Sequence, residues 1–219
     1  MLTFPLQQAR RVLCLGAHPD DIEIGCGGGL LTLLEEPERV DVCWVVFSGS
    51  EARAEEARRS ADRFLTNAKH RLVEICDFPD RWFPYSGEAL KNRVHEIAGE
   101  FSPDLIFSHR RKDQHQDHRL LAELTWHAFR DHLILEYEIP KYEGDLGQPN
   151  LFVPLSEEAA TRKVETITEV FRSQHDKYWF DPQTLWSLLR LRGLECRSSS
   201  GFAEGFHCRK LVLSGASQG

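Results

Sequence analysis

The sequence predicts an α/β protein, a Rossmann-like three-layer sandwich built around a mostly parallel central sheet. Short apolar runs alternate four or five times with segments of helical periodicity. Parallel neighbours in a sheet need crossover connections, so this alternation favours a parallel sheet with helices on both faces. After Ile139 the chain becomes rich in Gly and Pro, and this change predicts a smaller C-terminal α+β portion.

The expected strands are short apolar segments. Residues 11–16 (RVLCLG) end in glycine, which suits a buried parallel strand, and residues 40–47 (VDVCWVVF) follow the same pattern. The remaining predicted strands are 71–76, 105–108, 133–139 and a late strand at 206–213.

The expected helices are recognised by apolar stripes and by their start signals. One stripe in residues 50–65 consists of Ala54, Ala57, Ala61, Phe64 and Leu65. Ser156 and the pair Asp181-Pro182 are typical of helix starts. The other predicted helices are 27–34, 88–101, 118–129, 156–173 and 181–192, and residues 141–154 are predicted to form a loop.

The chain has 219 residues and a mass of 25.2 kDa, which is room for one domain. We expect a single domain over 1–219, with an α/β core at 1–139 and a C-terminal extension at 140–219 packing on it. The net charge of −7 argues against a broad nucleic-acid-binding face.

No membrane span is predicted, because the longest clean apolar run, residues 42–47, is far shorter than the ~20 residues that a spanning helix needs. The six cysteines include no CxxC pair, and several lie in apolar runs. Reduced, mostly buried thiols are typical of a cytosolic protein, so a cytoplasmic location is expected.

A polar segment, Gly16-Ala-His-Pro-Asp-Asp-Ile-Glu23, follows the first predicted strand directly. Open α/β sheets bind ligands outside the carboxyl ends of their strands, so this segment lies where a site is expected. The adjacent carboxylates of Asp20 and Asp21 are costly unless a cation or hydrogen bonds compensate them. His18 and Asp21 can hold one ion from a tight turn, which leaves Asp20 for a different task.

This segment has two other interpretations, of which the first stays open and the second fails. Asp20 and Asp21 could simply cap the helix that follows. A dinucleotide-binding loop at Gly25-Cys-Gly-Gly-Gly29 fails on spacing, because the third glycine of that fingerprint would fall on Leu30. The glycines are better explained by close packing of a helix on the sheet and by backbone approach to a ligand.

A second polar cluster follows the fourth predicted strand. His115 and His118 are spaced for one side of a helical first turn, with Asp117 between them. In the common doubly wound order the first and fourth strands are neighbours, so both clusters would face one crevice. The donors His18, Asp21 and His118 leave open coordination positions and suit catalytic zinc, although the same set can hold ferrous iron.

The motif Ala17-His-Pro-Asp-Asp21 with Glu23, followed by His115-Gln-Asp-His118, resembles the PIG-L/LmbE family of zinc-dependent N-acetylglucosaminyl deacetylases. The resemblance implies one Zn²⁺ per chain on His18, Asp21 and His118, with another divalent metal as an alternative. It implies that Asp20 is the general base. It also implies that His115 stabilises the transition state and that Asp117 orients a catalytic histidine.

The resemblance also suggests that Arg53 and Asp80 contact the substrate. An exposed helix arginine and a turn aspartate are the alternatives for these two positions. The implied reaction hydrolyses an N-acetylglucosamine-type sugar conjugate to a free amine and acetate, with a protonated His115 facing the developing oxyanion. A ferrous-iron enzyme and a non-catalytic sugar- or nucleotide-binding domain are the alternatives. The sequence leaves the aglycone and a homo-oligomeric state open.

Overall fold

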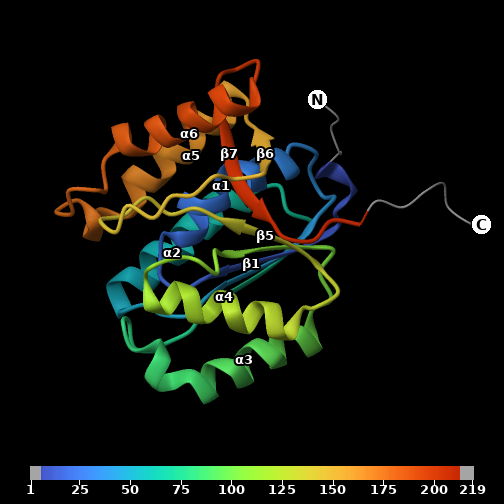
Figure 1. Ribbon diagram of the computed structural model, residues 1–219, viewed down its shortest axis with the longest axis vertical. Coiled ribbons are helices and arrows are strands. Elements are labelled where there is room, and N and C mark those ends of the chain that lie inside the picture. Colours follow the sequence, from blue (N-terminus) through green and yellow to red (C-terminus); the bar gives the residue numbers. More distant parts are fainter. Residues whose placement is uncertain (1–5, 213–219) are drawn as a thin grey trace, which may run out of the picture.

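The computed structural model describes residues 6–212 and confirms the predicted α/β fold (Figure 1). Within these residues one seven-stranded sheet has the order β3-β2-β1-β4-β5-β7-β6. The first five strands are parallel, whereas β7 lies antiparallel to both β5 and β6. The strands are β1 Arg11–Gly16, β2 Asp41–Val46, β3 His70–Ile75, β4 Leu105–His109, β5 Leu133–Tyr137, β6 Leu151–Pro154 and β7 Ala203–Cys208.

Helices cover both faces of the sheet (Figure 1). On one face lie α1 Asp21–Leu33, α2 Glu51–Phe64, α5 Glu157–Val170 and α6 Pro182–Cys196. On the other face lie α3 Gly87–Glu100 and α4 Gln116–Ala128. Three short 3₁₀ helices complete the described chain, namely η1 Leu6–Gln8, η2 Phe83–Ser86 and η3 Arg172–Gln174. No helix among the described residues is long and apolar enough to cross a membrane.

Alternate side chains of β1 build the two halves of the core. Val12 and Cys14 pack into the cluster that contains α1, α2, α5 and α6, whereas Leu13 and Leu15 pack toward α3 and α4. Successive strand residues point to opposite faces of a sheet, so a strand buried on both faces is apolar throughout. This is why the continuous apolar run at residues 11–16 predicted the strand correctly.

The structure differs from the sequence-based prediction in the C-terminal third. The predicted loop at 141–154 contains strand β6, a four-residue strand that pairs with β7 at the sheet edge. So short a strand beside Gly and Pro gives little signal, and Pro154 is tolerated because it ends an edge strand. The late strand predicted at 206–213 instead spans Ala203–Cys208, and Leu213 lies outside the described residues.

Helix α1 begins at Asp21 and not, as predicted, at Gly27. Its glycines lower helix propensity, but they allow the helix backbone to approach its neighbours closely. A Cβ atom at Gly25 would collide with the ring of Tyr137, and one at Gly27 would lie 2.7 Å from Phe64. Tertiary packing therefore outweighs the local cost of the glycines.

Two buried ion pairs join the C-terminal elements to the rest of the fold. Lys163 on α5 donates to Glu204 on β7 at 2.6 Å, and Glu204 in turn accepts from the backbone N–H of Gly28 and Gly29. Arg192 on α6 donates two hydrogen bonds to Glu138, each 2.8 Å long. Such fork-shaped, charge-assisted contacts fix geometry closely.

Candidate metal and catalytic site

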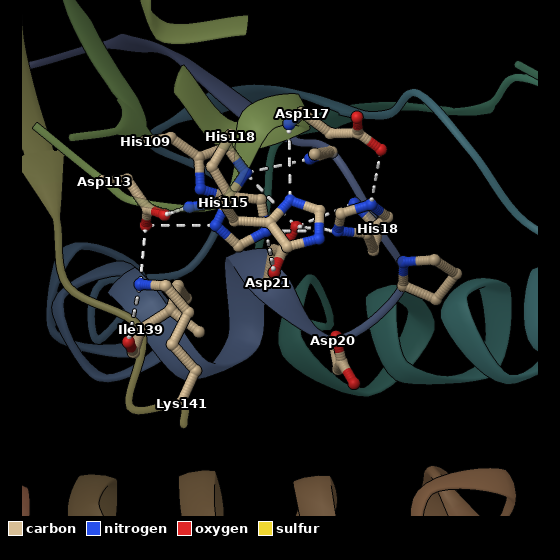
Figure 2. Close-up of polar contacts among 12 residues, drawn as sticks. His18, Asp20, Asp21, His109, Asp113, His115, Asp117, His118, Ile139 and Lys141 are labelled. Atoms are coloured by element: carbon tan, nitrogen blue, oxygen red, sulfur yellow. Dashed lines mark hydrogen bonds and ion pairs between the residues drawn. The ribbon is translucent and has the colours of Figure 1, made fainter. Parts of the chain in front are cut away.

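The two polar motifs meet at the carboxyl ends of β1 and β4, which are adjacent strands (Figure 2). The ring nitrogens His18 Nδ1 and His118 Nε2 lie 3.1 Å apart, although 100 residues of chain separate them. Asp21 lies against both rings, with Oδ2 3.4 Å from His18 Nδ1 and Oδ1 3.5 Å from His118 Nε2. The structure thus brings together the three residues that sequence analysis proposed as metal ligands.

These donor distances fit a metal ion. Two ligands bound at about 2.1 Å with tetrahedral angles are ~3.4 Å apart, close to the three separations between the histidine and aspartate atoms. Further donor atoms surround the same rings and form overlapping sets with them. The sets are His18 with His115 and His118, Asp21 with His109 and His118, and His18 with Asp80 and Asp117.

The charge state of this cluster also suits a cation. Burial, reinforced by His109, lowers the pKa of His118 to about 3, so its ring is neutral. Burial opposes ionisation of Asp21, yet the nearby histidines His118 and His109 hold its pKa well below the usual range. Burial also opposes protonation of His18, but Asp117 and other carboxylates raise its pKa well above normal. The neutral ring of His118 and the carboxylate of Asp21 are in the forms that bind metals. The carboxylates that raise the pKa of His18 favour a positive charge at this site, which a metal ion would supply in place of the ring proton.

Asp20 occupies the residue before α1 and is held in an unusual backbone conformation. Its φ of 94° lies in the left-handed region, which non-glycine residues rarely adopt and which is frequent at functional sites. Its side chain makes no capping hydrogen bond to the helix, so the helix-cap interpretation is not supported. The turn aims Asp20 away from the histidine cluster (Figure 2).

The Asp20 carboxylate is buried, and its Oδ2 atom has no hydrogen-bond partner among the described residues. Burial raises the pKa of Asp20 to about 7, although Arg53 opposes the shift. Arg53 Nη2 lies 3.6 Å from this oxygen and donates to the carbonyl of Pro19 at 2.8 Å. A buried acid with a raised pKa and an oxygen that makes no hydrogen bond with any described residue, one residue before Asp21, has the properties of a proton acceptor.

His115 lies at the start of α4, where its Nδ1 atom accepts a long hydrogen bond of 3.3 Å from the backbone N–H of Asp117. A neutral ring that accepts at Nδ1 carries its proton on Nε2. Burial lowers the pKa of His115, and the neighbouring His18 adds to the effect. The structure therefore favours a neutral His115 in place of the protonated ring of the sequence-based hypothesis.

Asp117 is fully buried and joins the histidine cluster to the loop after β3. Its Oδ2 lies 3.2 Å from His18 Nε2 and accepts from the backbone N–H of Arg81 at 2.6 Å. Its Oδ1 accepts from Phe83 at 3.2 Å. The carboxylate thus contacts His18, whereas only the backbone of Asp117 reaches His115.

Arg53 and Asp80, the two predicted substrate contacts, lie together at the exposed side of the cluster. Arg53 Nη1 is 3.6 Å from Asp80 Oδ2, and Asp80 Oδ1 is 3.1 Å from His18 Nε2. The Asp80 side chain is 44% exposed, and its bond to His18 lowers its pKa to about 2. Arg53 therefore lies between Asp20 and Asp80 as a shared cationic partner.

The structure adds residues to which the sequence analysis gave no role. His109 at the end of β4 stacks on His118 and lies 3.2 Å from Asp21 Oδ2. Asp113 contacts His118 Nδ1 at 3.1 Å, and Lys141 contacts Asp113. His109 and Asp113 lie in the same histidine- and aspartate-rich segment as His115, which was a usable signal, whereas no sequence pattern marks Lys141.

Lys177 is a further addition from the C-terminal third. Its ammonium group interacts electrostatically with Arg53, Asp20 and Asp80, and burial together with Arg53 lowers its pKa. Lys177 also lines an open pocket of about 490 Å³ formed by residues between His175 and Thr184. The C-terminal third therefore contributes a charged side chain near Asp20 and Asp80.

Fold and site together define a doubly wound α/β protein with a buried cluster of metal-binding residue types at its topological switch point. Residues 13–129 match the PIG-L family model, which is described as GlcNAc-PI de-N-acetylase. The chain belongs to the PIG-L family. It is 31% identical to a diacetylchitobiose deacetylase of Thermococcus kodakarensis, over 92% of this chain and 84% of that relative.

Solved structures share the fold. The N,N'-diacetylchitobiose deacetylase of Pyrococcus horikoshii matches with a TM-score of 0.72 and 22% identity, over 93% of this chain and 85% of that one. GalB of Pseudomonas putida, a 4-carboxy-2-hydroxymuconate hydratase, matches with a TM-score of 0.74 and 17% identity, over 95% and 99%. Because a hydratase shares the architecture, the fold alone does not define the reaction. The family and the deacetylase relative indicate an enzyme that hydrolyses N-acetyl amides.

Proposed function

We propose that this protein is a zinc-dependent de-N-acetylase that converts an N-acetylglucosamine-type sugar conjugate to a free amine and acetate. The observation that carries the proposal is the buried acid Asp20, which directly precedes the clustered donor Asp21, interacts electrostatically with Asp21 and His18, and has an Oδ2 atom that makes no hydrogen bond within the described part of the chain. A binding site alone has no need for such an acid. Free thiols at all six cysteines support a cytoplasmic location.

His18, Asp21 and His118 would hold the metal. When bound, zinc supplies Lewis acidity, which polarises the acetyl carbonyl and makes water acidic enough to react near neutral pH. Asp20 is not needed as a ligand, so its carboxylate is free to accept the proton that the attacking water gives up. The same acid, once protonated, returns the proton to the departing sugar nitrogen as the carbon–nitrogen bond breaks.

His115 is the hydrogen-bond donor for the acetyl oxygen in this mechanism. Its Nδ1 is occupied by the backbone N–H of Asp117, so the proton of the neutral ring is carried by Nε2. A fixed donor of this kind stabilises the charge that develops on the oxygen in the transition state. Arg53 and Asp80 bind sugar hydroxyls at the outer side of the cluster, where Asp80 is accessible.

The proposal is tested by incubating zinc-loaded protein with N-acetylglucosamine, N,N'-diacetylchitobiose and larger N-acetylglucosamine conjugates, and by detecting released primary amine. We expect amine and acetate in equal amounts from at least one substrate, and a rate lowered by roughly 10²- to 10⁴-fold in the Asp20→Asn variant. Zinc-loaded protein that binds these sugars without releasing amine would instead support a binding domain. Turnover that requires ferrous iron and oxygen would overturn the zinc assignment.

A further inference from the structure

A buried lysine outside the two motifs contacts the acid behind one of the proposed metal ligands (Figure 2). Lys141 Nζ lies 2.9 Å from Asp113 Oδ2 and 2.6 Å from Asp145 Oδ1. The three side chains are at most 9% exposed. Asp113 Oδ2 also lies 3.1 Å from His118 Nδ1. A continuous chain of contacts therefore runs from Lys141 through Asp113 to His118.

We propose that Lys141 is a positioning residue that holds Asp113 against His118 and so orients the His118 ring for the metal. The inference rests on the proposed metal site, because it needs His118 to be a ligand. An acid at Nδ1 accepts the ring proton there and leaves the Nε2 lone pair free, which is the usual arrangement behind a metal-bound histidine. In this structure Nε2 is the atom that faces His18 and Asp21.

The Asp113 carboxylate is held on both oxygens. Its Oδ1 atom accepts a hydrogen bond from the backbone N–H of His115 at 2.7 Å. Its Oδ2 atom accepts hydrogen bonds from His118 Nδ1 and Lys141 Nζ. Without Lys141, the Oδ2 atom loses a cationic partner in a buried environment, where an uncompensated carboxylate is costly. Asp113 would then rotate or recruit water, and the direction of the His118 ring would no longer be determined.

A purely structural role is the competing explanation. Asp145 also accepts from the backbone N–H of Gln114 at 2.7 Å, and its carbonyl accepts from Arg110 at 2.9 Å. Lys141 could therefore serve only to tie the segment after β5 to the segment after β4. That role predicts a loss of stability in the metal-free protein and no separate change in metal affinity.

The test measures zinc affinity of the metal-free full chain by competition with a chromogenic chelator, together with thermal unfolding without metal. We expect Lys141→Met to bind Zn²⁺ about 10- to 100-fold more weakly, the usual effect of removing a partner of a ligand. Lys141→Arg should retain most of the affinity, because it keeps the charge near Asp113. The absorption spectrum of bound Co²⁺ should change in Lys141→Met, which reports the ligand geometry directly.

The matched control is Lys163→Met, which removes another buried lysine from an ion pair, the one with Glu204. This variant should be less stable than the wild type, but its zinc affinity should stay within about threefold of the wild-type value, because Lys163 contacts neither a proposed ligand nor a partner of one. Lys141→Met with wild-type affinity and an unchanged Co²⁺ spectrum would overturn the inference. If Lys141→Met does not fold, Asp113→Asn decides by the same criterion. A wild-type chain that binds zinc no better than His118→Ala would refute the metal site itself.

Discussion

Arg53 Nη2 lies 3.6 Å from Asp20 Oδ2, the buried oxygen that has no hydrogen-bond partner among the described residues. Arg53 also approaches Asp80 at 3.6 Å, so one guanidinium is shared by the proposed base and by a proposed sugar contact. A substrate that binds between Asp20 and Asp80 would meet the proposed base and the proposed sugar-binding groups together. This relationship makes the separate roles of the three residues testable.

Replacing the proposed base should separate chemistry from metal binding. Asp20→Asn keeps the size of the side chain and removes the proton acceptor, so we expect a full zinc content with kcat lowered by roughly 10²- to 10⁴-fold. Steady-state kinetics with elemental analysis measure both quantities. Asp62→Asn, an exposed aspartate paired with Arg71, is the control and should be unaffected. Near-normal turnover by Asp20→Asn would remove Asp20 as the base.

The neighbouring aspartate should behave in the opposite way. Asp21→Ala removes a carboxylate that touches both His18 and His118, so we expect the variant to lose its zinc and, with it, its activity. Elemental analysis after dialysis provides the measurement. His95→Ala, a change at an exposed histidine on α3, should leave the zinc content intact. A full zinc complement in Asp21→Ala would refute the ligand role.

Arg53 should affect substrate binding while leaving the metal in place. Arg53→Met removes the shared cationic partner and keeps much of the aliphatic stem, so kcat/KM should fall about 10- to 100-fold, as for a lost hydrogen bond to a charged group. Zinc content should not change. Arg58→Met, an exposed arginine on the same helix, controls for the loss of charge. Equal kinetics for both variants would show that Arg53 is only a surface arginine.

The glycines of α1 should be intolerant of substitution where the helix meets the sheet. A Cβ at Gly25 collides with the ring of Tyr137, which is fixed by its 2.6 Å hydrogen bond to the carbonyl of Leu15. Gly25→Ala should therefore lower the free energy of unfolding by about 1–3 kcal/mol. Gly99→Ala on α3 meets nothing within 4 Å and should instead raise it by about 0.5–1 kcal/mol. Urea unfolding compares the two, and equal stability changes would contradict the packing argument.

His207 should make the fold sensitive to acid. Burial, together with the cations Arg110, Arg192 and Lys112, lowers the pKa of His207 to about 4, although Glu138 lies 3.9 Å from its Nε2. The unfolded chain binds this proton near pH 6.5, so the free energy of unfolding should fall as the pH drops from about 6.5 to about 4.

The His207→Gln variant should lose less stability over the same range, and the difference should be about 1 kcal/mol because the ring is only half-buried. Urea unfolding of the metal-free proteins at pH 7 and pH 4 measures it. Parallel losses in the two proteins would show that His207 does not contribute.

Sequence analysis predicted the elements whose signal is local. The strand at residues 11–16 is apolar almost throughout because both of its faces are buried in the core. Helix α2 shows an apolar stripe because only one side of the helix is buried. The edge strand β6 was missed, since it is four residues long and is stabilised mainly by pairing with β7. The early start of α1 was also missed, because packing against Tyr137 and Phe64 outweighs the poor helix propensity of its glycines.

By itself, the sequence determined the α/β architecture and the two motifs that supply His18, Asp21 and His118. Periodicity and residue type are local properties. The order of the strands places both motifs at the carboxyl ends of two adjacent strands. Only the tertiary structure decided that Asp117 contacts His18, that His115 accepts from the backbone of α4, and that Lys141 lies behind Asp113. These contacts join segments far apart in the chain, and their geometry depends on how loops pack across the strand ends, which no local pattern encodes.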